Sequence, residues 1–313
     1  MRAIFFGTPA IAVPSLRALA DVAEVTAVVC QPDRPAGRGM KLRPPPVKEA
    51  ALELGLPVHQ PTKVRNQAFA DWVTAQQTDV ALVIAYGRIL SQRVLDGPRR
   101  GCMNLHASIL PRYRGAAPIN WAIVHGETET GIALMQMDAG MDTGPVFTTR
   151  TLPIGPDETA GELAERLGQL AAVVVREDLP AAVNGTLRAT PQDHDAATMA
   201  PMMSKEDGRI DWSQPAKRVH DHARGMTPWP GAHTTLDGKR FKVLATRRLD
   251  TTSEATPGTV VDIATSGEQP HAVVSCGEGC VALLRGQLAG KKALDAGQLA
   301  AGRTIAVGTV LGT

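Results

Sequence analysis

The chain has 313 residues, of which 43% are hydrophobic, and this is enough for one large domain or two ordinary ones with a substantial core. The formal net charge of +2 excludes a surface that binds polyanions as a whole, and only 4% of the residues are aromatic, so any nucleic-acid contact has to come from a local basic patch. The longest strongly apolar run, residues 80–86, is far shorter than the roughly 20 residues that cross a bilayer, and we expect a cytoplasmic protein without a membrane anchor.

The first half of the chain alternates short apolar runs with helical stretches. Strands are predicted over residues 4–6, 25–30, 79–86, 102–106 and 131–137. Helices are predicted over residues 9–20, 47–54, 88–95, 116–124 and 158–182. Repeated alternation of this kind is typical of an α/β domain built on a doubly wound parallel sheet.

The pattern changes after residue 187. Residues 188–208 lose periodicity and gain polar residues, as a linker does. From residue 209 to residue 313, short strand-like runs are punctuated by glycine and proline, which is typical of a small antiparallel barrel. The sequence therefore predicts a first domain over residues 1–187, a linker over 188–208 and a second domain over 209–313.

Residues 31–46 follow a strand but begin no helix. They are almost free of apolar side chains and carry four cationic residues, namely Arg34, Arg38, Lys41 and Arg43. A structureless segment of this length in a compact domain is usually functional or disordered. Glycines flank Arg38, so the backbone there can approach a nucleic acid closely, and an arginine can bind a phosphate or a base edge with two hydrogen bonds. A disordered surface insertion is the alternative.

Nucleotide and metal motifs are missing. Gly7 lies where a dinucleotide-binding turn places its first glycine, but the second and third glycines are absent, and no Walker lysine motif occurs. The four cysteines form no Cys-x-x-Cys pair, and no second pair of ligands follows Cys276 and Cys280 at zinc-site spacing. We therefore expect reduced thiols and no metal.

Polar side chains gather where two successive strands are predicted to end. Asn104 and His106 alternate along the strand, so they lie on the same face near its C-terminal end, where open α/β sheets bind ligands. Residues 138–144 follow the next strand, and two glycines make them a tight loop that can present a carboxylate over the same edge. We favour Asp142 over Asp138, because Asp142 lies in the Asp-Thr-Gly turn. A strand that ends in a satisfied polar pair is the alternative for His106.

An asparagine, a histidine and an aspartate at one sheet edge suit acyl transfer to an amine. The amide can donate a hydrogen bond to a developing oxyanion. The imidazole can do the same or relay a proton, and the carboxylate can orient the imidazole and stabilise its cationic form. The sequence has no serine or cysteine nucleophile elbow, so we expect direct attack by the amine of the substrate.

At these residues the sequence resembles the 10-formyltetrahydrofolate-dependent formyltransferase family. Its signatures correspond here to residues 104–111, 114–119, 135–138 and 141–144. The resemblance covers almost the whole chain and implies a Rossmann-like catalytic domain followed by an OB-like β-barrel. It also implies that Asn104, His106 and Asp142 are the catalytic residues.

The resemblance implies both substrates. The formyl donor is 10-formyltetrahydrofolate, and the residues expected to line its site are Ser108, Ile109, Leu110, Pro111, Ala85, Tyr86 and Gly87. Residues 31–39, 203–212 and 290–294 are most similar to those of the members that act on tRNA, so we expect the α-amino group of methionyl-initiator tRNA as the acceptor and a role in translation initiation. The expected tRNA contacts are Arg34, Arg38, Lys41, Arg43, Lys205, Lys291 and Lys292. No protein partner is implied.

Two other functions fit the same residues less well. A formyltransferase for a small-molecule amine, or a formyl-tetrahydrofolate hydrolase, would share the core but would need neither the basic segment nor a second domain. An RNA-binding module with an inactive core would not need Asn104, His106 and Asp142 together. Assays of formyl transfer to tRNA and to small amines separate these functions.

Overall fold

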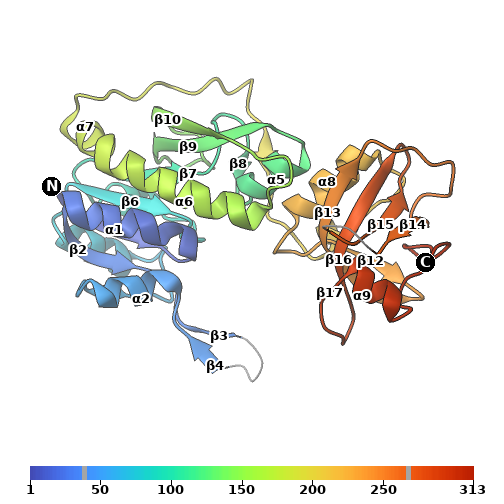
Figure 1. Cartoon of the computed structure of the whole chain (residues 1–313). Coiled ribbons are helices and arrows are strands. Elements are labelled where there is room, and N and C mark those ends of the chain that lie inside the picture. The colour runs from blue at the N-terminus through green and yellow to red at the C-terminus, as the bar shows by residue number, and fades with distance from the viewer. Residues whose placement is uncertain (37–40, 266–268) are drawn as a thin grey trace. The chain divides into compact units, whose positions relative to one another are not determined.

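The computed structural model describes residues 1–36, 41–265 and 269–313. It divides into two compact units, and neither is a continuous piece of the chain (Figure 1). The first unit consists of Met1–Pro118, Glu129–Leu152 and Ala164–Pro201. The second consists of Ile119–Thr128, Pro153–Leu163 and Met202–Thr313.

The described part of the first unit contains a seven-stranded sheet in the order β10-β9-β7-β6-β1-β2-β5. The strands are β1 (Arg2–Gly7), β2 (Glu24–Val29), β5 (Val58–His59), β6 (Val80–Ile84), β7 (Cys102–His106), β9 (Glu129–Gln136) and β10 (Val146–Pro153). From β5 to β7 all neighbours pair in parallel. All five residues of β6 are buried, as its continuous apolar run predicts for a central parallel strand.

Helices lie between these strands or follow the last of them. They are α1 (Val13–Val22), preceded by a 3-10 turn η1 (Ala10–Ala12), then α2 (Pro46–Glu53), α3 (Gln67–Ala75), α4 (Gln92–Leu95), α6 (Ala160–Glu177) and α7 (Leu179–Asn184). Asn66 caps α3 by accepting a hydrogen bond from the backbone N–H of Phe69. The ring of Phe69 then packs edge-on against Phe6, with 6.3 Å between ring centroids. No helix of the described ranges combines the length and the apolar character that a membrane crossing requires.

One edge of the sheet departs from the parallel pattern. Strand β9 pairs antiparallel with β7, so that His106 lies opposite Ala133 and Met103 lies opposite Gln136. The hydrophobic pattern of a strand does not specify the direction in which it pairs. The expectation that residues 138–144 leave the sheet at the same edge as the end of β7 is therefore wrong, although the predicted class of a mainly parallel α/β sheet is confirmed.

The basic segment 31–46 has more regular structure than expected. Strands β3 (Arg34–Ala36) and β4 (Lys41–Arg43) pair antiparallel, with Arg34 opposite Arg43. Arg38 lies outside the described residues. A second small sheet joins β8 (Arg114–Gly115) in parallel to β11 (Met199–Ala200).

The second unit is built on an antiparallel sheet, which confirms the predicted change of class. Among its described residues the strand order is β12-β13-β16-β15-β14, and β17 pairs with β16. The strands are β12 (His233–Leu236), β13 (Lys239–Leu249), β14 (Val260–Ala264), β15 (His271–Ser275), β16 (Cys280–Leu288) and β17 (Leu294–Asp295). The remaining elements are α5 (Pro118–Val124), the 3-10 turn η2 (Glu206–Gly208), α8 (Ala216–Gly225) and α9 (Ala296–Ala301).

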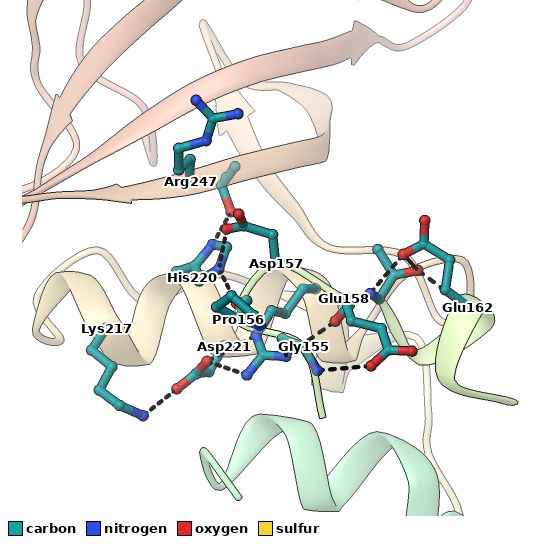
Figure 2. Close-up of polar contacts among 12 residues, drawn as sticks. Gly155, Pro156, Asp157, Glu158, Glu162, Lys217, His220, Asp221 and Arg247 are labelled. Atoms are coloured by element: carbon teal, nitrogen blue, oxygen red, sulfur yellow. Dashed lines mark hydrogen bonds and ion pairs between the residues drawn. The ribbon is translucent and has the colours of Figure 1, made fainter. Parts of the chain in front are cut away.

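Helix α8 contacts the segment between β10 and α6 through buried polar groups (Figure 2). The Nε and Nη2 atoms of Arg224 donate hydrogen bonds to Asp221 Oδ1 at 2.9 and 2.7 Å. Arg224 Nη1 donates to the carbonyl oxygens of Gly155 and Glu158, both at 3.1 Å. Asp221 and Arg224 are only 3% and 7% exposed, so this ion pair is isolated from water.

Candidate active site

His106 ends β7 and is buried. Its Nε2 atom lies 2.8 Å from the carbonyl oxygen of Tyr113. A carbonyl oxygen can only accept, so Nε2 carries a hydrogen. The other ring nitrogen, Nδ1, faces Asp142 Oδ2 at 3.6 Å. The imidazole is therefore held between a neutral acceptor and a carboxylate, and Nδ1 is the nitrogen that faces an ionisable group.

Asp142 reaches His106 because the loop after β9 turns back along the sheet. Its Oδ2 atom accepts a hydrogen bond from the backbone N–H of Gly115 at 2.9 Å. Asp138 does not share this role, since its Oδ1 atom accepts from the Gly140 backbone N–H and from Thr143 Oγ1, at 3.0 and 2.7 Å. Asp138 thus closes the loop, and Asp142 presents the carboxylate to the histidine.

Asn104 lies two residues before His106 on β7 and therefore projects from the same face. It is half-buried, and it lies opposite Val83 on β6 on one side and opposite Met135 on β9 on the other. None of the described residues forms a hydrogen bond with its side-chain amide, which can thus donate to a bound oxyanion. The structure brings the three predicted catalytic residues to one place.

Several polar residues around the site were not found from the sequence. Gln192 Nε2 donates to the carbonyl oxygens of Asp142 and Gly144, at 2.9 and 2.6 Å. Thr198 Oγ1 accepts from the Tyr113 backbone N–H at 2.9 Å. Gln192 and Thr198 lie in the stretch that was expected to be a linker, where no periodic pattern marks individual residues.

The turn after β7 contributes less surface than expected for a ligand site. Ser108 is fully buried, and its hydroxyl donates to the carbonyl oxygen of Arg112 at 2.6 Å. Leu110 packs in a buried cluster with Ala133 and Met135. Ile109 and Pro111 are partly exposed, so of the four residues of this turn expected to line the folate site these two keep accessible side chains.

The turn after β6 presents backbone to the sheet edge. Tyr86 is buried, its ring packs edge-on against Phe6 with 5.3 Å between centroids, and burial raises the pKa of its phenol to about 12. Its carbonyl oxygen accepts hydrogen bonds from Thr8 Oγ1 and Gln31 Nε2. Ala85 is exposed, and both Ala85 and Gly87 have positive φ, at 47° and 76°. A ligand at this turn would contact Ala85 and Gly87 and would not contact the tyrosine ring.

Two grooves of the first unit are lined by cationic side chains. One, of about 750 Å³, lies between the ends of β1 and β2 and the β3–β4 hairpin, and its cations are Arg34 and Arg43. The other, of about 520 Å³, is lined by residues 62–66 with Arg88 and Ile89, whose side chain is 66% exposed. Both combine apolar surface with positive charge.

All the described residues that are expected to contact tRNA are exposed. Arg34 donates to Gln31 Oε1 at 2.5 Å, and Lys41 and Arg43 lie on β4. In the second unit Lys205 precedes η2, and Lys291 and Lys292 lie in the connection between β16 and β17. In the described ranges no group of three metal-ligating side chains is placed to hold an ion.

Two family models cover most of the chain. Residues 1–177 match the model described as formyl transferase, and residues 202–304 match that of the formyl transferase C-terminal domain. The methionyl-tRNA formyltransferase of Sorangium cellulosum (strain So ce56) is 64% identical over 314 aligned residues, which span 100% of both chains. That of Trichlorobacter lovleyi (strain ATCC BAA-1151 / DSM 17278 / SZ) is 47% identical over 311 residues, 99% of this chain and 96% of the relative.

A solved structure shows the same fold at much lower identity. WlaRD, a sugar 3N-formyl transferase crystallised in the presence of dTDP and 5-N-formyl-THF, is 16% identical with a TM-score of 0.66. The match covers 93% of this chain and 99% of WlaRD. Together with the matches over the full length, this fold places the chain in a family: it belongs to the formyltransferases and, within them, to the methionyl-tRNA formyltransferases.

Proposed function

We propose that the protein transfers a formyl group from 10-formyltetrahydrofolate to the α-amino group of methionyl-initiator tRNA and so supports translation initiation. The observation that carries this proposal is the contact of His106 with Asp142 beside the accessible amide of Asn104, in a chain 64% identical over its full length to a methionyl-tRNA formyltransferase. Asn104, His106 and Asp142 are the proposed catalytic residues.

The reaction needs a neutral amine and a stabilised oxyanion. An α-amine titrates near pH ~8, so a useful fraction is neutral near neutrality. Its nitrogen attacks the formyl carbon, and the new C–N bond leaves a tetrahedral oxyanion, to which the Asn104 amide and a protonated His106 can donate hydrogen bonds. The proton lost by the amine passes to Asp142 directly or through water. The bond between the formyl carbon and the folate nitrogen then breaks, and that nitrogen takes up a proton as tetrahydrofolate leaves.

Folate binding is supported by the chemistry of the sheet edge. WlaRD, which has the same fold, was crystallised in the presence of 5-N-formyl-THF. In this chain Ile109, Pro111, Ala85 and Gly87 offer accessible apolar side chains and backbone near the candidate catalytic residues. The groove that contains Ile89 adds apolar surface and the cationic Arg88, which suit a planar ring system with an anionic tail. The side chains of Ser108, Leu110 and Tyr86 would then support the site from below.

Binding of tRNA is assigned to exposed cations in both units. Arg34, Lys41 and Arg43 on the β3–β4 hairpin would contact the acceptor end, as would Arg38, which lies between β3 and β4 in the sequence. Lys205, Lys291 and Lys292 would contact the backbone elsewhere on the tRNA. Such contacts neutralise phosphates and make binding dependent on salt.

The experiment that tests the function compares acceptors. Purified protein is given 10-formyltetrahydrofolate with methionyl-initiator tRNA, with methionine amide, or with no acceptor, and N-formyl product and free formate are quantified. We expect transfer to the tRNA to exceed transfer to the small amine by at least about a hundredfold in kcat/KM. Equal use of the small amine, release of formate without an acceptor, or binding of tRNA without transfer would each contradict the proposal and favour one of the alternatives.

A further inference from the structure

Residues 190–200, termed the strap here, are attached at both ends around the candidate catalytic residues. At one end Thr190 and Val146 exchange two backbone hydrogen bonds of 2.8 and 2.9 Å. At the other end the carbonyl oxygen of Ala200 accepts from the Ala116 backbone N–H at 2.9 Å. The strap therefore has a defined path, and a side chain on it can act as a fixed support.

Gln192 extends from the strap to the loop that carries Asp142. Its Nε2 atom donates to the carbonyl oxygens on either side of Thr143, those of Asp142 and Gly144, at 2.9 and 2.6 Å. Its Oε1 atom accepts from Arg114 Nε and Nη2, at 3.1 and 2.7 Å. A guanidinium can only donate, so the amide has one orientation that satisfies all four hydrogen bonds.

The loop needs such a support. Asp142 has a φ of 53°, in the left-handed region that non-glycine residues rarely occupy. A backbone in that region persists only where its surroundings hold it. The direction of the Asp142 carboxylate toward Gly115 N and His106 depends on this backbone, and Gln192 binds its carbonyl oxygen directly. Arg114 is 5% exposed and keeps Gln192 in place from below.

We propose that Gln192, held by Arg114, is a positioning residue for formyl transfer, because it fixes the loop that presents Asp142 to His106. This inference rests on the proposed function. The competing explanation is that the hydrogen bonds of Gln192 only stabilise the loop. It makes different predictions for turnover and for the coupling between Gln192 and Asp142.

The first test is Gln192→Glu. A glutamate keeps its partner Arg114 but loses both donors and places an oxygen against two carbonyl oxygens. We expect kcat to fall about 10- to 100-fold while KM for folate and for methionyl-tRNA stays within about threefold, since small displacements of reacting groups affect turnover and leave binding intact. Gln192→Met, which is neutral and of similar length, should show the same loss.

The matched control is Gln76→Glu. Gln76 is also half-buried and donates to a backbone carbonyl, that of Trp72, but it lies at the C-terminal end of α3, and its described contacts are away from the catalytic residues. We expect unchanged kcat. Thermal unfolding of all variants shows whether they fold, and loss of folding in both Gln192 variants would overturn the proposal in favour of a structural role.

The decisive measurement is a double-mutant cycle with Asp142→Asn. If Gln192 acts through Asp142, Gln192→Glu lowers kcat by less than about threefold in the Asp142→Asn background. The same 10- to 100-fold loss in both backgrounds would overturn the proposal, as would a wild-type kcat for Gln192→Glu. A wild-type protein that does not formylate methionyl-tRNA contradicts the proposed function and the inference with it, whereas an active wild type with fully active Gln192 variants contradicts the inference alone.

Discussion

The Nε2 atom of His106 donates a hydrogen bond to the carbonyl oxygen of Tyr113 across 2.8 Å. Tyr113 has a φ of 60°, and its N–H is bound by Thr198, so the acceptor is itself fixed. One nitrogen of the imidazole is thereby committed to the protein. Any proton that His106 exchanges with Asp142 or with a substrate during turnover has to pass through Nδ1.

Replacing Asp142 by asparagine should remove the charge that faces Nδ1 while leaving an oxygen that can accept from Gly115 N–H. We expect kcat to fall by roughly two to three orders of magnitude, the size of effect seen when one group that stabilises a transition state is lost. Asp138→Asn is the control in the same loop, with an expected loss below about tenfold. Single-turnover formyl transfer measures both, and an Asp142→Asn rate within a few-fold of wild type would remove the residue from the catalytic set.

Gly115 supports the site in a way that no other residue can. Its φ is 119°, and a Cβ atom there would lie 2.7 Å from the carbonyl oxygen of Ala200. We expect Gly115→Ala to reduce the free energy of unfolding by more than ~2 kcal/mol, because strain and a backbone clash add. Turnover should fall as well, since Gly115 N–H binds Asp142.

Gly55→Ala separates the two causes. Gly55 also has a positive φ, 67°, but no heavy atom of the described residues beyond its chain neighbours lies within 4 Å of an added Cβ. Only backbone strain remains, so we expect Gly55→Ala to reduce the free energy of unfolding by about 1 kcal/mol. Denaturant unfolding monitored by circular dichroism compares the two variants, and equal losses would show that the contact with Ala200 is unimportant.

The sequence predicts strands and residue types better than it predicts pairing. The predicted ends of β6 and β7 lie within two residues of the observed ones, and for β6 the reason is that burial on both faces leaves a continuous hydrophobic signature. The expected parallel direction of β9 is wrong, since a continuous apolar run fits either orientation. The Asp-Thr-Gly turn favours Asp142 over Asp138, but Asp142 lies near His106 for another reason, namely the return of the loop along the sheet.

The supporting residues could not be predicted. Gln192 and Thr198 lie in an aperiodic polar stretch, and their partners are about 50 and 85 positions away in the chain. Ser108 stands beside the catalytic strand and invites a role in binding, but its hydroxyl is used within its own turn. Side-chain direction in irregular segments depends on tertiary contacts that local sequence does not encode.

The buried ion pair of the second unit should be sensitive to loss of one partner. Arg224→Met would leave the Asp221 carboxylate, which is 3% exposed, with only Lys217 at 2.7 Å among the cations described around it. Removing one member of a buried pair typically costs about 3–5 kcal/mol. Arg248→Met is the control, because the side chains of its pair with Asp250 are 54% and 95% exposed, and we expect a change below about 0.5 kcal/mol. Chemical unfolding distinguishes the two, and a small loss for Arg224→Met would mean that Lys217 suffices.

Stability should decrease as the pH falls from about 7.5 to 5.5. Burial lowers the pKa of His220 below its ordinary value of 6.5, and its neutral ring is satisfied because Nε2 donates to the Pro156 carbonyl and Nδ1 accepts from Thr246. Burial lowers the pKa of His222 and of His59 as well. Below pH ~6.5 the unfolded chain binds protons that the folded chain does not, so folding is disfavoured by up to about 1.4 kcal/mol per pH unit for each such histidine.

His220→Gln tests one contribution to this slope. Between pH 7.5 and 5.5 we expect the free energy of unfolding to depend less steeply on pH. The slope should decrease by up to the amount that corresponds to one bound proton. Carboxylates with lowered pKa, such as Asp207 and Asp211, contribute only near pH ~4 and below, outside this window. An unchanged slope for His220→Gln would show that this ring binds protons equally in the folded and the unfolded chain over this pH range, and would contradict the prediction.

The β3–β4 hairpin should contribute binding of tRNA and not chemistry. We expect Lys41→Ala and Arg43→Ala each to raise KM for methionyl-tRNA several-fold, to leave kcat unchanged, and to lower the slope of log affinity against log salt by about one. Arg17→Ala is the control, because Arg17 is neutralised by Glu53 in an ion pair of 2.5 Å. Titrations of each variant with methionyl-tRNA at two salt concentrations measure these effects. An unaltered KM would show that the hairpin is an ordinary surface element.

The discontinuity of the two units limits how this protein can be recombined. Residues 119–128 and 153–163 belong to the same compact unit as residues 202–313, although in the sequence they are interleaved with segments of the first unit. A chimera that exchanges only the sequence after residue 201 would pair α8 of one parent with the Gly155 and Glu158 carbonyls of another. We therefore expect exchange between distant relatives to preserve stability better when the three segments of this unit are transferred together.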